Sequence, residues 1–190
     1  TGPLGIQLDS LADAVTSGIV PGFIMYKLIE STLGTDNTLF FSSNEFSIAK
    51  LQSVIPFFGF LITIAAIYRL AKFNISEDQK HHFVGLPTPA NAIFIAGLAL
   101  VITDDQFTLV NYIDTTWFLL IVTLLSCYIM NSKLNLFALK FKSYDFNSNK
   151  LRYLFIATVI LIVSLIGINA IPLTIILYIL FSLLANIKFK

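Results

Sequence analysis

Charged residues are scarce in this sequence of 190 residues: 12 are Lys or Arg and 11 are Asp or Glu, together 12% of the chain. Soluble domains usually carry about 25%. The formal net charge of +1 excludes a strongly basic surface of the kind that binds nucleic acid. A single cysteine, Cys127, excludes an internal disulfide. Hydrophobic residues make up 56% of the chain, including 18 Phe, which is more apolar side chain than a soluble core of this length can hide but not more than lipid can cover.

A helix needs about 20 mostly apolar residues to cross a bilayer. Six apolar runs in the sequence approach or reach this length. We expect membrane spans at residues 6–30, 46–71, 89–102, 115–130, 151–168 and 172–187. No run shows the alternation of a membrane β-barrel, and an open sheet edge cannot face hydrocarbon. The sequence therefore predicts an all-α fold, a polytopic transmembrane helix bundle that forms a single transmembrane domain over residues 1–190.

Basic residues recur on every second connection between these runs. Lys72 and Lys80 follow the second run, residues 133–152 carry five Lys or Arg, and the tail ends in Lys188 and Lys190. The connection with Asp104 and Asp105 carries no basic residue. Because cytoplasmic loops are enriched in Lys and Arg, we expect a multi-pass protein of the cytoplasmic membrane whose first run begins on the cytoplasmic side.

Gly5, Asp9 and Asp13 lie four residues apart at the start of the first run. This spacing places them on one face of a helix. Charged residues inside a span are costly and are functional candidates by default. Two carboxylates one turn apart can share a hard divalent cation, or one can bind metal while the other handles a proton. The alternative is a frayed helix end with solvated acids.

A second group of polar residues, Arg69, Lys72 and Asn74, ends the second run. Cations at a helix end often only extend to the interface, but the same group could bind a phosphate or a carboxylate.

Small residues and prolines mark the expected turns and close contacts. Residues 85–89 predict a rigid turn into the third run. Gly18 and Gly22 predict close helix packing, with a bend at Pro21. We expect Asn91, a lone polar residue, to be satisfied by a hydrogen bond between helices.

Three motifs then bear on the family. Gly5, Asp9 and Asp13 match the second half of the pattern D-x2-D-G-x2-A-R-x8-G-x3-D-x3-D, and residues 8–13 read LDSLAD. Residues 69–74 read RLAKFN and residues 83–90 read FVGLPTPA. In this order the three motifs resemble the bacterial phosphatidylserine synthase branch of the CDP-alcohol phosphatidyltransferase family, in which the second motif is RLARFN. Beyond residue 90 the resemblance is one of hydropathy only.

The resemblance implies an enzyme that transfers a phosphatidyl group from CDP-diacylglycerol to the hydroxyl of L-serine. Phosphatidylserine and CMP would form at the cytoplasmic face, with two Mg²⁺ or Mn²⁺ ions. Asp9 and Asp13 would bind metal, and Asp13 would also be the general base. Gly5 and Asp9 would border CDP-diacylglycerol. Arg69, Lys72 and Asn74 would bind serine or phosphate, and the enzyme would be a homodimer.

The first half of the pattern, D-x2-D-G-x2-A-R, does not occur in this sequence. The resemblance implies that these acids, the remaining metal ligands, lie before Thr1 on one of about two further helices. The complete protein would then have about eight spans, and we expect the 190-residue chain by itself to be inactive.

Other functions fit parts of the same pattern. A sibling phosphatidyltransferase using glycerol phosphate or inositol would keep the aspartates without the motifs at residues 69–74 and 85–89. An intramembrane prenyltransferase also uses acids at D-x3-D spacing, but it needs a second acidic cluster, and Asp104–Asp105 is predicted on the opposite face. A transporter or scaffold would place polar groups near the midplane of several helices, and the last three runs have almost none.

Overall fold

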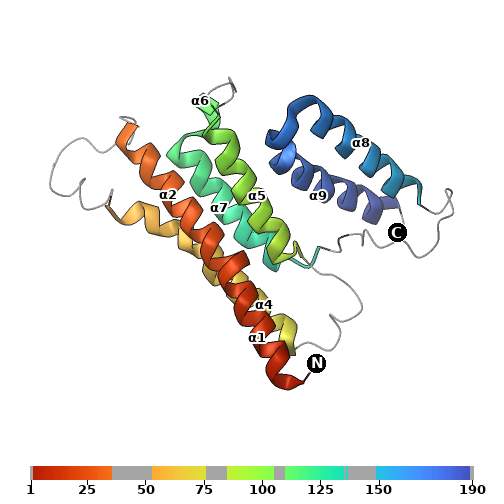
Figure 1. The fold of residues 1–190 in the computed structure, drawn as a ribbon, viewed down its shortest axis with the longest axis horizontal. Helices are drawn as coiled ribbons and strands as arrows, with labels where there is room; N and C mark the ends of the chain where they lie inside the picture. Colours follow the sequence, from red (N-terminus) through yellow and green to blue (C-terminus); the bar gives the residue numbers. More distant parts are fainter. Residues whose placement is uncertain are drawn as a thin grey trace.

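The computed structural model describes residues 2–35, 53–75, 85–104, 110–134, 136 and 149–188. These residues form helices joined by turns, with no strand among them. Figure 1 shows the helices packed side by side as a bundle. The predicted all-α helix bundle is confirmed; its description as a single domain stays a prediction.

The first run is one long helix with an irregular centre. α1 (Pro3–Ala14) continues through a π-helical turn, η1 (Val15–Ile19), into α2 (Val20–Thr35). Pro21 has no N–H to donate to the carbonyl one turn earlier. The chain widens there instead, and the Val20 N–H bonds to the Val15 carbonyl oxygen. The hydroxyl of Thr63, on α4 (Leu61–Ile75), donates a hydrogen bond to the Gly18 carbonyl oxygen at 2.9 Å. The bend expected at Pro21 is therefore a π turn that is stabilised by a hydrogen bond from a neighbouring helix.

Gly18 and Gly22 do pack closely, as predicted. A Cβ at Gly18 would lie 3.4 Å from Ala66 Cβ, and one at Gly22 would overlap the Thr63 hydroxyl. The fit is reciprocal, because a Cβ at Gly59 would lie 2.5 Å from the backbone nitrogen of Tyr26. The first two apolar runs therefore meet backbone to backbone.

The second run contains a 3₁₀ turn, η2 (Ile55–Phe60), and α4 (Leu61–Ile75); its predicted beginning, residues 46–52, lies outside the described residues. The remaining elements are α5 (Thr88–Ile102), the short α6 (Val110–Ile113), α7 (Thr116–Asn131), α8 (Lys150–Ile166), the 3₁₀ turn η4 (Gly167–Ala170) and α9 (Ile171–Lys188).

Three helical runs among the described residues are long and apolar enough to cross a membrane: Leu4–Leu33, Ile55–Ile75 and Lys150–Leu184. The third folds back at Gly167, where φ is +69°, so α8 and α9 form a hairpin (Figure 1). α5 and α7, with 15 and 16 residues, are only about 23 Å long at about 1.5 Å per residue.

Hydrogen bonds at both ends of the bundle show that successive helices run in alternating directions. Where the chain begins, Asn74 bonds Ser10, and the Gly85 N–H bonds the Leu134 carbonyl oxygen at 2.8 Å. At the far end, the hydroxyls of Thr32 and Thr116 lie 2.8 Å apart, and Asn169 bonds Asp104. Between the two ends lies a core that includes Met25, Ile29, Ile62, Ile95 and Leu119.

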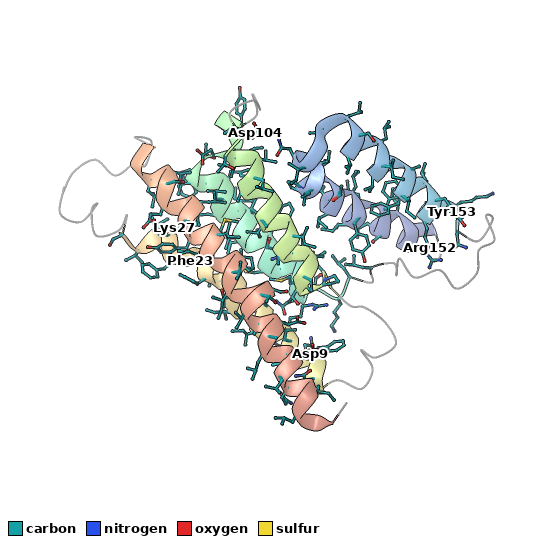
Figure 2. All side chains as sticks on the ribbon, in the orientation of Figure 1. Asp9, Phe23, Lys27, Asp104, Arg152 and Tyr153 are labelled. Atoms are coloured by element: carbon teal, nitrogen blue, oxygen red, sulfur yellow. The ribbon has the colours of Figure 1, made fainter. Side chains whose placement is uncertain are left out.

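The charges of the described connections follow the predicted asymmetry. Lys72, Lys133 and Lys150 lie at helix ends on the side where α1 begins, and Asp104 lies at the opposite end (Figure 2). Which of these ends faces the cytoplasm stays a prediction.

One polar position differs from expectation. Asn91 is fully buried, yet neither its amide nitrogen nor its oxygen has a hydrogen-bond partner among the described residues. The predicted helix-to-helix hydrogen bond at Asn91 is wrong: the residues that share a cavity with Asn91 are apolar except Ser126, and Ser126 makes no hydrogen bond to it.

Candidate functional site

A pocket of about 490 Å³ opens at the end of the bundle where the chain begins. Figure 1 shows α1 and the last turns of α4 continuing past the start of α5. The pocket lies beside the start of α5, between the parts of α1 and α4 that extend beyond it. Its walls come from α1 and α4 and its floor from the segment that enters α5; the lining residues are Gly5, Ile6, Asp9, Ser10, Asp13, Arg69, Leu70, Phe73, Asn74, Pro87, Thr88 and Pro89.

α1 contributes the predicted acidic face. Gly5, Asp9 and Asp13 all line the pocket, as residues one turn apart on a regular helix should. Asp9, labelled on α1 in Figure 2, is exposed, and Asp13 is half-buried. The two carboxylates therefore reach one pocket from different depths.

α4 contributes a cation and an amide. Arg69 is half-buried, and its Nε has no hydrogen-bond partner among the described residues. Arg69 lines the pocket, so its guanidinium places a positive charge beside the two carboxylates, and an arginine side chain is well suited to binding a carboxylate or a phosphate. Asn74 lines the pocket as well, whereas Lys72 lies exposed on α4 outside the lining set, so the binding role of Lys72 stays a prediction that the pocket does not support.

Ser10 joins the two walls, which the sequence did not indicate. The Asn74 amide donates to Ser10 Oγ at 2.9 Å, and Ser10 Oγ lies 3.1 Å from the Ile6 carbonyl oxygen. This contact fixes the position of the Asn74 side chain relative to α1. The only sequence signal was the place of Ser10 between Asp9 and Asp13 in the LDSLAD motif.

The floor begins with the turn predicted at residues 85–89. Gly85 has φ +75°, and a Cβ there would overlap the Met130 carbonyl oxygen at the end of α7. Only glycine meets both conditions without strain. The turn is therefore confirmed, and its glycine is required by the close approach of α7.

Backbone hydrogen bonds attach this turn to the end of α7. The Leu86 N–H bonds the Ile129 carbonyl oxygen at 3.3 Å, beside the bond from Gly85 to Leu134. The last carbonyls of a helix lack partners within it, and the turn supplies one. Pro87, Thr88 and Pro89, which follow, are thereby held as the pocket floor.

Among the described residues that line the pocket, Asp9 and Asp13 supply the carboxylates that could bind a metal ion. Among the described residues, no group of three or more His, Cys, Asp and Glu side chains could hold a metal ion. Mg²⁺, however, is commonly bound by one or two carboxylates together with substrate phosphates and water. Asp9 and Asp13 fit that partial ligand set, and Arg69 beside them fits a phosphate.

Comparison with known proteins gives relatives of a single kind. The chain is 31% identical over 108 residues to the CDP-diacylglycerol–serine O-phosphatidyltransferase of Bacillus subtilis (strain 168), covering 55% of this chain and 46% of the relative. It is 30% identical over 125 residues to the same-named protein of Mycobacterium leprae (strain TN), covering 62% and 34%. The protein of that name from Helicobacter pylori (strain J99 / ATCC 700824) is 30% identical over 109 residues, covering 56% and 38%.

No family model and no solved structure matches the chain. The aligned part spans less than half the length of each of these curated relatives. The resemblance predicted from the motifs is confirmed at this level: over about half of its length, the chain is homologous to CDP-diacylglycerol–serine O-phosphatidyltransferases.

Proposed function

We propose that this protein transfers a phosphatidyl group from CDP-diacylglycerol to the hydroxyl of L-serine, giving phosphatidylserine and CMP. The observation that carries the proposal is the pocket in which Asp9 and Asp13 of α1 face Arg69 and Asn74 of α4. The names of the relatives support the choice of substrates.

In this reaction the serine hydroxyl oxygen attacks the phosphorus atom attached to diacylglycerol. The bond from that phosphorus to the oxygen of CMP breaks, and CMP leaves with the electron pair. The attacking hydroxyl must lose a proton. Asp13, the deeper of the two acids, is the group that takes it, because a positioned carboxylate can act as a general base.

Asp9 and Asp13 would hold a divalent cation, Mg²⁺ or Mn²⁺. Bound there, the cation neutralises phosphate charge, which is the main requirement of phosphoryl-type transfer. Asp9, the more exposed of the two acids, is the acid that meets the diphosphate. Gly5 leaves room for the nucleotide one turn away, since it has no side chain.

Arg69 and Asn74 bind an anion in this proposal, either the serine carboxylate or the phosphate it approaches. The position of Arg69 and Asn74 in the pocket lining supports this role. Ser10 positions the Asn74 amide from α1, so that the acceptor-binding wall keeps a fixed distance from the acidic wall.

The proposed setting is the cytoplasmic face of the cell membrane. In this proposal the pocket between the projecting ends of α1 and α4 (Figure 1) would lie at the level of the lipid headgroups, where the CDP group of the donor would be. The side that carries Lys72, Lys133 and Lys150 is the cytoplasmic one by the rule for basic loops. The resemblance adds a homodimer, which mass photometry of the purified protein can test.

The activity is tested in lipid vesicles by measuring CMP release from CDP-diacylglycerol by the purified complete protein, because the 190-residue chain by itself is expected to be inactive. We expect release to require L-serine and to stop when EDTA removes divalent cations. Glycerol 3-phosphate and inositol, supplied in place of serine, should give no product. Release with one of these alcohols and not with serine would replace the proposed acceptor, and release that persists in EDTA would contradict the metal-dependent chemistry.

A further inference from the structure

A second cavity, of about 310 Å³, lies among α5, α7 and α9. It shares no lining residue with the candidate site. Its lining includes Leu86, Asn91, Val122, Ser126, Ile175 and Ile179. Ligand pockets commonly fall between about 300 and 1,000 Å³, so the size suits a small or slender ligand.

Asn91 and Ser126 are the two polar residues in the otherwise apolar lining of this cavity, and Asn91 is the one with unpaired atoms. The residue is 0% exposed, and its side-chain nitrogen and oxygen are both without partners among the described residues. Buried polar groups are nearly always hydrogen-bonded, and an amide left unpaired in hydrocarbon costs several kcal/mol. A buried water needs two to four polar partners, and apolar side chains dominate this lining. The occupant should therefore be apolar and carry a polar group at one end.

The rim of the cavity shows where such an occupant enters. Leu125, Ile176 and Leu180 line it and are 52%, 43% and 49% exposed. In a membrane helix bundle these exposed side chains face hydrocarbon. The occupant therefore comes from the bilayer.

The length and depth of the cavity match one lipid chain. Its lining follows α7 from Phe118 to Ile129, about 17 Å along a helix axis, and half of the hydrocarbon core measures about 15 Å. Asn91 is the fourth residue of α5, about 5 Å from the start of the helix, close to the depth at which ester groups of glycerolipids lie.

We propose that this cavity binds an acyl chain of an ester-linked glycerolipid, with the Asn91 amide donating a hydrogen bond to the ester carbonyl. Leu86 in this cavity adjoins Pro87 in the floor of the candidate site. The chain can therefore belong to a resident phospholipid or to a lipid whose headgroup occupies the candidate site. The proposal concerns binding and does not depend on the proposed reaction.

Photocrosslinking in vesicles tests this. The probe is phosphatidylglycerol with a diazirine on one acyl chain, and adducts on the purified protein are mapped by mass spectrometry. We expect adducts on cavity-lining residues of α7 and α9. Leu125→Trp fills the cavity and should reduce these adducts severalfold. Leu124→Trp is the matched control, because Leu124 is its neighbour, is 58% exposed and does not line the cavity.

Asn91→Leu tests the polar contact with little risk to folding, since it replaces an unpaired amide by an apolar side chain of similar size. Loss of one neutral hydrogen bond should lower labelling about two- to tenfold. Excess CDP-diacylglycerol then identifies the source: displacement of the probe assigns the chain to that donor lipid, and persistence assigns it to a bilayer phospholipid. Equal labelling of the two Trp variants would overturn the site, as would absence of cavity adducts, and unchanged labelling in Asn91→Leu would overturn the role of the amide.

Discussion

At the level of single residues, the two acids of α1 have different surroundings. Asp9 is exposed and Asp13 is half-buried one turn further along the same pocket. The deeper position suits proton transfer and the outer one suits binding of a charged diphosphate. Substitutions at the two positions should therefore affect different kinetic parameters.

We predict that Asp13→Asn lowers kcat about 10²- to 10⁴-fold, the usual effect of removing a general base. The apparent KM for CDP-diacylglycerol should change little, because the other acids still bind the metal and the donor, and the lost interaction belongs mainly to the transition state. Steady-state kinetics with CDP-diacylglycerol and serine are the measurement. Asp104→Asn, at the opposite end of the bundle (Figure 2), is the control. A kcat for Asp13→Asn close to that of the wild type would remove Asp13 as the base.

We predict that Arg69→Ala and Asn74→Ala raise the apparent KM for serine about tenfold to a hundredfold, the range for a hydrogen bond to a charged group. The KM for CDP-diacylglycerol should rise less. Lys133→Ala, an exposed cation at the same end but outside the pocket, should leave both values unchanged. If the serine KM of Arg69→Ala is unchanged, Arg69 does not bind serine and is only a cation at a helix end that extends to the membrane interface.

Some residues of the site could be predicted from the sequence and others could not, for a physical reason. The shared face of Asp9 and Asp13 follows from helix periodicity, which is a local property. The placement of Arg69 and Asn74 beside them came only from the motif resemblance. The Ser10–Asn74 contact and the unpaired Asn91 depend on how distant helices meet, and no local pattern contains that information.

At the level of elements, apolar runs located the helices well, because lipid imposes a minimum length on each span. The first run was predicted at 6–30 and is found from Pro3 to Thr35. The π turn within it was not predicted. It depends on a hydroxyl that Thr63 supplies from a helix far along the sequence, whereas Pro21 alone indicated only a bend.

The π turn holds one residue more than a regular α-helical segment of the same rotation, so it keeps the acids of α1 on the face that meets α4. We predict that insertion of one alanine after Thr16, an exposed residue of this turn, leaves a folded protein in which α1 is rotated by about 100°, so that the acids face away from the pocket and transferase activity is lost. Thr16→Ala keeps the backbone length and should stay active. The measurements are CMP release and size-exclusion chromatography; full activity in a folded insertion variant would contradict the positioning role.

The turn at Gly85 should be the more sensitive of two glycine positions with positive φ. Gly85→Ala adds a Cβ against the Met130 carbonyl oxygen, while Gly167→Ala, at φ +69°, meets nothing within 4 Å. Both variants carry a backbone cost of about 1–3 kcal/mol for a side chain at positive φ, but only Gly85→Ala adds a collision. We expect a larger loss of thermal stability for Gly85→Ala than for Gly167→Ala, measured by Trp117 fluorescence during heating. Equal losses would mean that the contact between Gly85 and α7 contributes little to stability.

At the level of the whole molecule, the alternating helix directions predict that the connections lie on two sides of the membrane. In a Cys127→Ser background, a cysteine replacing Lys133 should react with a membrane-impermeant maleimide only from the cytoplasmic side. One replacing Thr103, next to Asp104, should react only from the opposite side. Labelling of both positions from one side would contradict the alternating arrangement.

The unequal helix lengths bear on the elasticity of the surrounding bilayer. α5 and α7 are about 7 Å shorter than a hydrocarbon core of about 30 Å, whereas α1 to α2 runs unbroken from Pro3 to Thr35. Lipids next to the short helices must compress or tilt, at a cost of fractions of a kcal/mol per Å. A locally thinner bilayer beside α5 would bring the headgroups of the neighbouring lipids closer to the pocket floor. The membrane itself would then help to deliver the lipid substrate of the proposed reaction, and thicker bilayers would slow that reaction without any change in the residues of the protein.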